Sequence, residues 1–234
     1  MTMKKYRGDT GVSPVVGVML MLVVTIIIAA VVSAFAGGMG KTTEKAPTVS
    51  MECRIANGGT WGSSEFDCAV MGTSDAIPTR DLKIITSWTA RDGTNGGATI
   101  TGPNNTYPNT RTHSTSGGSY HSPLGFGPGV GNTTSTGSYT PDQSFGNYSL
   151  VAGTHMHNVP YGYTPAYGGY GVSVDTRYSY TFGSSYMAGD QDALQAILGN
   201  NWEKLRQGDV VKLRMFHIPS GKIIYEKDVT VGGQ

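Results

Sequence analysis

One segment of the chain, Val15–Phe35, reads VVGVMLMLVVTIIIAAVVSAF. It lies inside a longer stretch, Thr10–Gly40, that contains no charged residue. Because an α-helix rises about 1.5 Å per residue, about 20 apolar residues cross the ~30 Å hydrocarbon core of a bilayer. The sequence therefore predicts an N-terminal helix that can span a membrane. The basic residues Lys4, Lys5 and Arg7 precede it, which predicts a cytoplasmic N-terminus with the rest of the chain outside.

Two other interpretations of this segment stay open, and its length disfavours both. A buried core helix of a soluble protein rarely runs so far without a polar face. An ordinary secretory signal has an apolar core of about 7–15 residues and is removed at a small-residue site. The residues Ala34-Phe35-Ala36 imitate such a site, but the apolar run before them is too long.

The residues between the basic start and the apolar run carry a more specific pattern. They read Gly11-Val12-Ser13-Pro14-Val15-Val16-Gly17. A short basic leader, this string and a long apolar helix together resemble the N-terminus of archaeal type IV pilins of the adhesion type, which carry a class III signal peptide. The resemblance implies that a membrane-embedded prepilin peptidase cuts between Gly11 and Val12, with Gly8–Asp9 as a second choice. The apolar helix then stays on the mature protein.

The resemblance also implies how the chain is organised and what it does. The parts are a cleaved leader at 1–11, a transmembrane and filament-core helix at 12–36, a hinge and linker at 37–48, and an extracellular head at 49–234. The implied function is a structural subunit of an extracellular type IV pilus-like filament, a homo-oligomer that serves surface adhesion. The implied partners are the prepilin peptidase, an assembly ATPase with its platform protein, and the membrane before assembly. One departure from bacterial pilins is that no Glu lies near the fifth mature position, so subunit register has to come from packing.

The composition excludes several other classes of protein. The 17 Lys and Arg residues against 16 Asp and Glu leave no excess positive charge for binding nucleic acid. Two cysteines are too few for a disulfide-rich scaffold. The 34 glycines, with many Ser and Thr, oppose a helical bundle.

The chain after the linker shows strand patterns. Val49–Met71 alternates apolar and polar residues on both sides of a polar loop, which predicts two strands that place Cys53 and Cys68 on apolar faces. An extracellular location permits oxidation, so we predict a disulfide between them, with two buried free thiols as the alternative. A further strand is predicted at Leu82–Trp88, a hairpin from Asp209–Ile218 and Ile223–Val231, and a short helix at Asp190–Gly199.

The predicted fold class is therefore α+β. A long N-terminal apolar helix is followed by a β-rich head of β-sandwich or immunoglobulin-like type with long Gly/Tyr-rich loops.

The middle of the head, residues 93–189, has an unusual composition. It holds only four charged residues, 19 Gly and 11 of the 13 Tyr. Disorder is one interpretation, but disordered segments are poor in aromatic residues. We favour an ordered insertion with a strand at Gly171–Phe182 and Tyr/Gly loops that contact neighbouring subunits. Glycosylation is predicted at the Asn-x-Ser/Thr sites of Asn104, Asn132 and Asn147.

Motifs that carry chemistry are weak in this sequence. The alternation of His155-Met-His157 places two imidazoles on one side of a strand, but two ligands are too few for a metal site, and surface histidines are the simpler interpretation. Asp190-Gln-Asp192 fits a helix N-cap better than a calcium loop. We predict no enzyme activity, no metal and no cofactor. The alternative function is a membrane-anchored binding module that does not polymerise.

Overall fold

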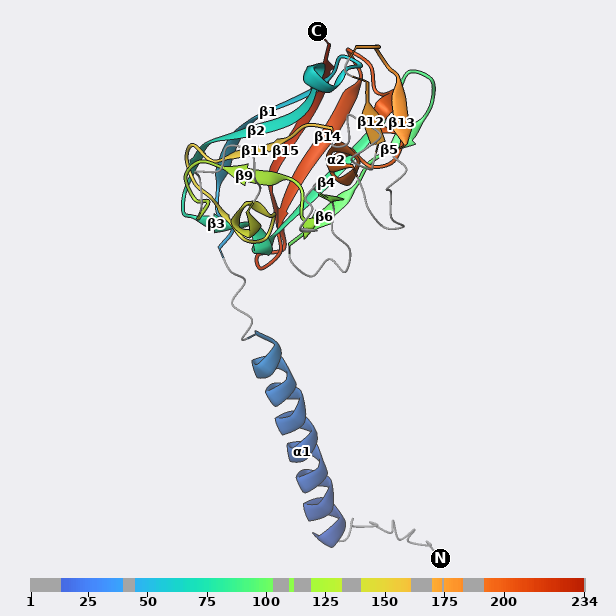
Figure 1. The fold of residues 1–234 in the computed structure, drawn as a ribbon. Coiled ribbons are helices and arrows are strands. Elements are labelled where there is room, and N and C mark those ends of the chain that lie inside the picture. The colour runs from blue at the N-terminus through green and yellow to red at the C-terminus, as the bar shows by residue number, and fades with distance from the viewer. Residues whose placement is uncertain are drawn as a thin grey trace, which may run out of the picture. The chain divides into compact units, whose positions relative to one another are not determined.

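The structure is a computed structural model. It describes residues 14–39, 45–102, 110–111, 119–131, 140–160, 170–173, 175–182 and 192–233, without the side chains of 35–39, 110–111, 119–120, 170–171 and 181–182. The chain divides into two units, Met1–Thr43 and Glu44–Gln234. The described part of the first unit is helix α1 (Pro14–Met39), and the second unit is the head (Figure 1).

The head is built mainly of β-strands. Nine strands join one sheet in the order β5-β4-β14-β15-β1-β2-β11-β9, with β6 beside β5 on the edge of β4. Their bounds are β1 (Val49–Asn57), β2 (Ser64–Thr73), β4 (Leu82–Thr89), β5 (Asn95–Gly96), β6 (Thr99–Thr101), β9 (Leu124–Phe126), β11 (His155–Asn158), β14 (Val210–His217) and β15 (Lys222–Gly232). Three two-stranded pairs are formed by β3 (Ile77–Pro78) with β10 (Ser149–Leu150), β7 (Thr110–Arg111) with β8 (Ser119–Tyr120), and β12 (Tyr170–Val172) with β13 (Tyr180–Phe182). The α+β class and the strand-rich head are thus confirmed.

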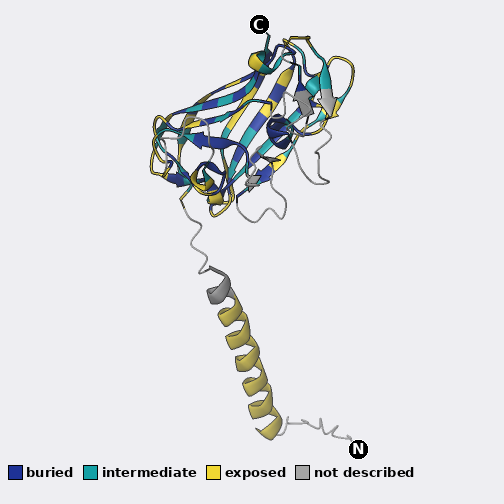
Figure 2. Ribbon diagram, in the orientation of Figure 1, coloured by how far each residue is buried: buried dark blue, intermediate teal, exposed yellow. Residues whose placement is uncertain are grey.

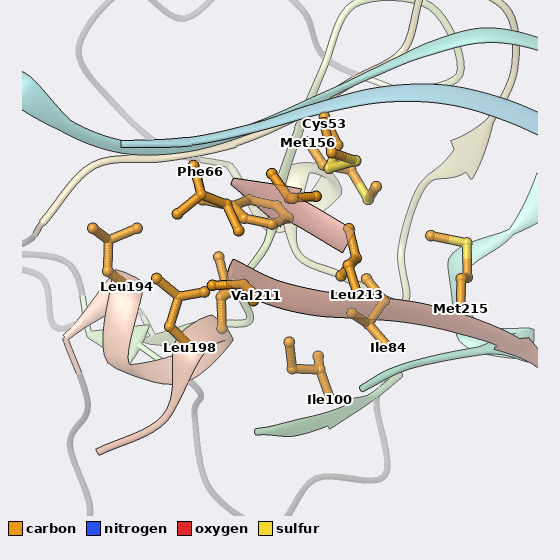
Figure 3. Close-up of a cluster of buried hydrophobic side chains, with 14 of the residues drawn as sticks. Cys53, Phe66, Ile84, Ile100, Met156, Leu194, Leu198, Val211, Leu213 and Met215 are labelled. Atoms are coloured by element: carbon orange, nitrogen blue, oxygen red, sulfur yellow. A yellow bond between two sulfur atoms is a disulfide. The ribbon is translucent and has the colours of Figure 1, made fainter. Parts of the chain in front are cut away.

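The sheet has two halves that are joined at one short contact. Strand β15 pairs with β14 along all of β14, but it pairs with β1 only at Ile55↔Val231 and Ala56↔Gly232, in parallel. The sheet therefore has two halves that meet at the C-terminal end of β15. One half is β9-β11-β2-β1, and the other contains β15, β14 and β4. Figure 3 shows side chains of both halves, such as Phe66 and Leu213, pointing into the same core. The head thus packs like a sandwich, while its strands form one continuous sheet.

Alternation of side chains along the strands produces this core. In β2 and β4 every second residue is buried as far as Val70 and Trp88, and the residues between them are partly exposed (Figure 2). A period of two places every second residue of a strand on the same face. The predicted strands at 49–71 and 82–88 and the C-terminal hairpin are found at these positions.

Helix α2 (Ala193–Leu198) covers one end of the core. Asp192 is its N-cap, and the carboxylate accepts hydrogen bonds from the backbone N–H groups of Leu194 (3.1 Å) and Gln195 (3.0 Å). The other end of the helix is held by strand β4, because Thr86 Oγ1 donates to the carbonyl of Ile197 and Trp88 Nε1 donates to that of Leu198, at 2.6 and 2.7 Å. These bonds satisfy carbonyl groups that a helix end otherwise leaves without partners.

The middle region contributes directly to the head. Strands β9 and β11 come from residues 93–189, and Phe145, Tyr148 and Leu150 of the same region are buried in the core. The predicted single strand at Gly171–Phe182 is wrong, because the structure has a hairpin of β12 and β13 there. The Ser173 hydroxyl accepts a hydrogen bond from the backbone of Thr176 at 2.9 Å, and such local bonds favour a turn over a continuous strand.

We predict that the buried N-cap makes head stability depend on pH. Burial raises the pKa of Asp192 well above its ordinary value of 3.8, against the opposing effect of its backbone hydrogen bonds. The raised pKa therefore adds to the free energy of unfolding of the head. This contribution is complete below about pH 3.8 and is lost as pH rises through the folded-state pKa. Asp192→Asn keeps an acceptor oxygen without a charge, so this loss should disappear. Asp192→Ala should cost about 0.5–2 kcal/mol because the cap is lost.

Urea unfolding of the full chain in detergent, followed from acid to alkaline pH, measures this effect. Equal pH profiles for the wild type and Asp192→Asn would contradict it.

Candidate assembly interface and head surface

Helix α1 is apolar on every side. It contains no Asp, Glu, Lys or Arg, and all its described side chains, from Pro14 to Ala34, are exposed (Figure 2). The exposed fractions of its large apolar residues run from 44% at Val24 to 72% at Met21, so apolar side chains lie on every face of the helix. Among the described residues, this is the one helix long and apolar enough to cross a membrane, judged by length and composition.

Local chemistry allows this segment to be a continuous helix. Pro14 stands at its first position, where its missing N–H has no helical partner to lose. The hydroxyl of Thr25 donates to the carbonyl of Leu22 at 2.9 Å, so this polar group is satisfied inside the helix. A helix of this kind needs lipid or other apolar helices around it, because each large apolar side chain loses about 1.5–3 kcal/mol when it stays in water.

The predicted cleavage site lies outside the described residues. Gly11 and Val12 both precede the first described residue, Pro14, and part of the predicted hinge and linker at 37–48 is also outside. Cleavage at this position remains a prediction.

The two cysteines are joined across neighbouring strands. Cys53 of β1 stands directly opposite Cys68 of β2, and their sulfur atoms are bonded at 2.02 Å. Both residues belong to the buried core, where Met156 of β11 stands opposite Cys68 in turn (Figure 3). The disulfide therefore joins β1, the strand that follows the predicted linker, to β2, its neighbour in the sheet.

One of the three predicted glycosylation sites can be placed. Asn104 and Asn132 lie outside the described residues. Asn147 is exposed in a turn, where its Nδ2 donates to the carbonyl of Pro141 at 2.8 Å. Its neighbour Tyr148 is buried and holds the turn in place, while the side chain of Asn147, which would carry the glycan, is exposed.

Tyr148 and Tyr180, two tyrosines of the middle region, serve the interior of the head. The Tyr148 hydroxyl donates to the carbonyl of Pro123 at 2.8 Å, and complete burial raises its pKa well above 10.0. Tyr180 packs edge-on against Trp202 with ring centroids 5.8 Å apart, and burial raises the pKa of Tyr180 to about 12. These two side chains are committed to intramolecular contacts. Most other tyrosines of the region lie outside the described residues.

The two strand histidines meet a carboxylate that sequence reasoning missed. His157 Nδ1 lies 3.2 Å from Oδ2 of Asp67, and His155 Nδ1 lies 3.7 Å from Oδ1 of the same side chain. The hydrogen bond from His157 is the largest cause that lowers the pKa of Asp67. Asp67 is 88 residues or more from both histidines in sequence, and only the pairing of β2 with β11 brings them together.

The other acidic candidates for metal binding are Asp190 and Asp192. Asp190 lies outside the described residues, and Asp192 is the N-cap of α2, as the sequence predicted for this acidic stretch. Within the described ranges, no group of three or more His, Cys, Asp or Glu side chains is arranged to hold a metal ion.

Comparison with known families identifies the N-terminal part of the chain. Residues 10–51 match the family described as archaeal type IV pilin, N-terminal. The chain carries the N-terminal domain of an archaeal type IV pilin. The match covers helix α1 and extends to Met51 in β1, so it includes the beginning of the head. No curated protein matches the chain.

The match of residues 10–51 to this family agrees with the geometry of α1. The pilin family is structural and in general not enzymatic, and its N-terminal segment is the part that matches here. The exposed apolar helix therefore belongs to the recognised segment, whereas the head, from β2 onward, lies beyond the match.

We predict that the disulfide contributes strongly to the stability of the head. The two cysteines are 15 residues apart, and closing a loop of this size stabilises by about 3 kcal/mol on the chain-entropy model. Reduction of the wild type should lower the melting temperature of the head by roughly 6–12 °C. Differential scanning calorimetry of the full chain in detergent, with and without reductant, measures the shift.

The matched control is the double variant Cys53→Ala/Cys68→Ala. Its melting temperature should not respond to reductant. A wild type that is equally insensitive, although mass spectrometry shows it to be reduced, would contradict the prediction.

Proposed function

We propose that this chain is the structural subunit of an archaeal type IV pilus-like extracellular filament, which polymerises through α1 and serves surface adhesion. The observation that carries the proposal is a helix that is apolar on every side and belongs to the segment matched by the pilin family. In lipid this helix is stable as a membrane-embedded precursor. Outside lipid, a bundle of identical helices is the arrangement that buries all its faces.

Assembly follows in a defined order in this proposal. A prepilin peptidase removes the leader between Gly11 and Val12 while the helix is in the membrane. An assembly ATPase and its platform protein then transfer the helix from the membrane to the growing filament. Since α1 has no charged residue, helix register depends on side-chain packing. Gly17 is a place where a neighbouring helix can approach closely, because it has no side chain.

The head coats the outside of the filament in this proposal. Its surface carries ion pairs such as Arg54–Glu65 and Lys212–Glu226, at 3.2 and 3.4 Å. Glycans on Asn104, Asn132 and Asn147 add hydration to a region that has few charges. The Tyr/Gly loops of residues 93–189 contact neighbouring heads or the adhesion target.

The mature protein in filaments sheared from cells provides the decisive test. We expect its N-terminal peptide to begin at Val12 and the peptide that contains Asn147 to be heavier than its sequence mass. Mass spectrometry of the sheared material reads both. A chain that still begins at Met1 and is found entirely in the membrane fraction would instead support a membrane-anchored surface module that does not polymerise.

A charge in the helix tests assembly separately from cleavage. Ile27→Lys places an ammonium group in the middle of α1, where it costs about 2.5–3.5 kcal/mol in a bilayer and more in a packed bundle without a partner. We expect filaments to disappear while the head keeps its disulfide and its melting temperature. Ile27→Val is the matched control and should form filaments. Normal filaments from Ile27→Lys would overturn the role of α1, and electron microscopy with the amount of sheared pilin decides the outcome.

A further inference from the structure

The cluster of Asp67, His155 and His157 lies on the outer face of the head sheet. Both histidines stand on β11, two residues apart, with the buried Met156 between them. Asp67 stands on the neighbouring strand, directly opposite His157 in register. The side chains are 50% exposed for His155, 34% for His157 and 31% for Asp67, so the cluster is accessible from solvent.

The carboxylate determines which ring nitrogen of His157 carries a proton, and His155 turns the same Nδ1 atom toward it at 3.7 Å. Asp67 is partly exposed, and a carboxyl group in such surroundings is ionised at neutral pH. An ionised carboxylate only accepts hydrogen bonds, and therefore the Nδ1 atom that faces it has to be the N–H donor. In a neutral imidazole this leaves the lone pair on Nε2.

Such an arrangement is the usual second layer of a metal site. A histidine that binds a metal ion through one nitrogen donates its other N–H to a carboxylate or a carbonyl, which holds the ring in place and makes it a better ligand. Here a single carboxylate faces Nδ1 of two histidines that share one face of a strand. The ring of Phe126 also contacts His157 edge-on, at 6.1 Å between centroids, and restricts that ring further.

We propose that the Nε2 atoms of His155 and His157 together bind one divalent transition-metal ion that prefers imidazole ligands, such as Zn²⁺, Ni²⁺ or Cu²⁺. Asp67 is a positioning residue that does not contact the ion. Two protein ligands leave the other coordination positions to water or to a group from another chain. This site differs from a closed structural zinc site, which takes four protein ligands.

The charges around the site do not oppose a cation. The nearest basic side chain in register is Arg54, opposite Asp67 on β1, and it is paired with Glu65 at 3.2 Å. On the other side, β9 contributes the aromatic ring of Phe126 and no charged residue. The local balance is therefore set by the Asp67 carboxylate, which is negative when both imidazoles are neutral.

Zn²⁺ titration of the full chain tests the site. The chain is purified in detergent without a histidine tag and titrated at pH 7.5 in a calorimeter. We expect one Zn²⁺ per chain, and we expect His155→Ala/His157→Ala to abolish the binding. Asp67→Asn should weaken the affinity by about 10–100-fold, because the orienting carboxylate is lost. Acidification should release the ion, since protons compete for the same nitrogens.

Matched controls separate the site from nonspecific binding. Asp228→Asn removes an acid that is exposed on β15, where it is paired with Lys212 at 3.6 Å, so Zn²⁺ binding should not change. Thermal unfolding without metal shows that each variant is folded. The proposal is overturned if the wild type shows no binding up to about 1 mM Zn²⁺, or if binding survives in the double histidine variant. Equal affinities of Asp67→Asn and the wild type would overturn the positioning role of Asp67.

Discussion

An apolar helix that cannot remain alone in water is the constraint on which this protein depends. Helix α1 has no polar face and no charged residue, and its large side chains are exposed along the described length. Lipid and a bundle of like helices are the two surroundings that remove this surface from water. The proposed passage from membrane to filament is a change between these two surroundings, and the head must remain folded throughout it.

The head meets this demand with a core that is closed by contacts between distant parts of the chain. Among the described residues, backbone pairing joins the two halves of its sheet at the C-terminal end of β15. Over the remaining length, side-chain packing and the hydrogen bond from the Tyr225 hydroxyl to the carbonyl of Met51 hold the halves together. The Cys53–Cys68 bond secures the strand that comes directly after the linker. At the other end of the core, Thr86 and Trp88 hold the last carbonyls of α2. The linker therefore leads into the half of the sheet that carries a covalent bond.

Much of this architecture could be predicted because it depends on local patterns of apolar and polar residues. The N-terminal helix follows from one continuous apolar run. The strands around Cys53 and Cys68, the strand from Leu82 and the C-terminal hairpin each follow from alternation within about ten residues. The middle region was harder, because its strands are short and its apolar residues are widely spaced. The segment from Gly171 to Phe182 has the composition of a strand, yet the hydrogen bond of the Ser173 hydroxyl turns it into a hairpin.

The sequence by itself determined the apolar helix, its resemblance to pilins and the residues that face inward in the longer strands. These features depend on residue type and local spacing alone. Only the tertiary structure decided that Tyr148 is a core residue, and that Asp67 lies between His155 and His157. Each of these results requires knowledge of which strands pair and in which register. Pairing between residues far apart in sequence depends on the packing of the whole head, so a local sequence pattern does not predict it.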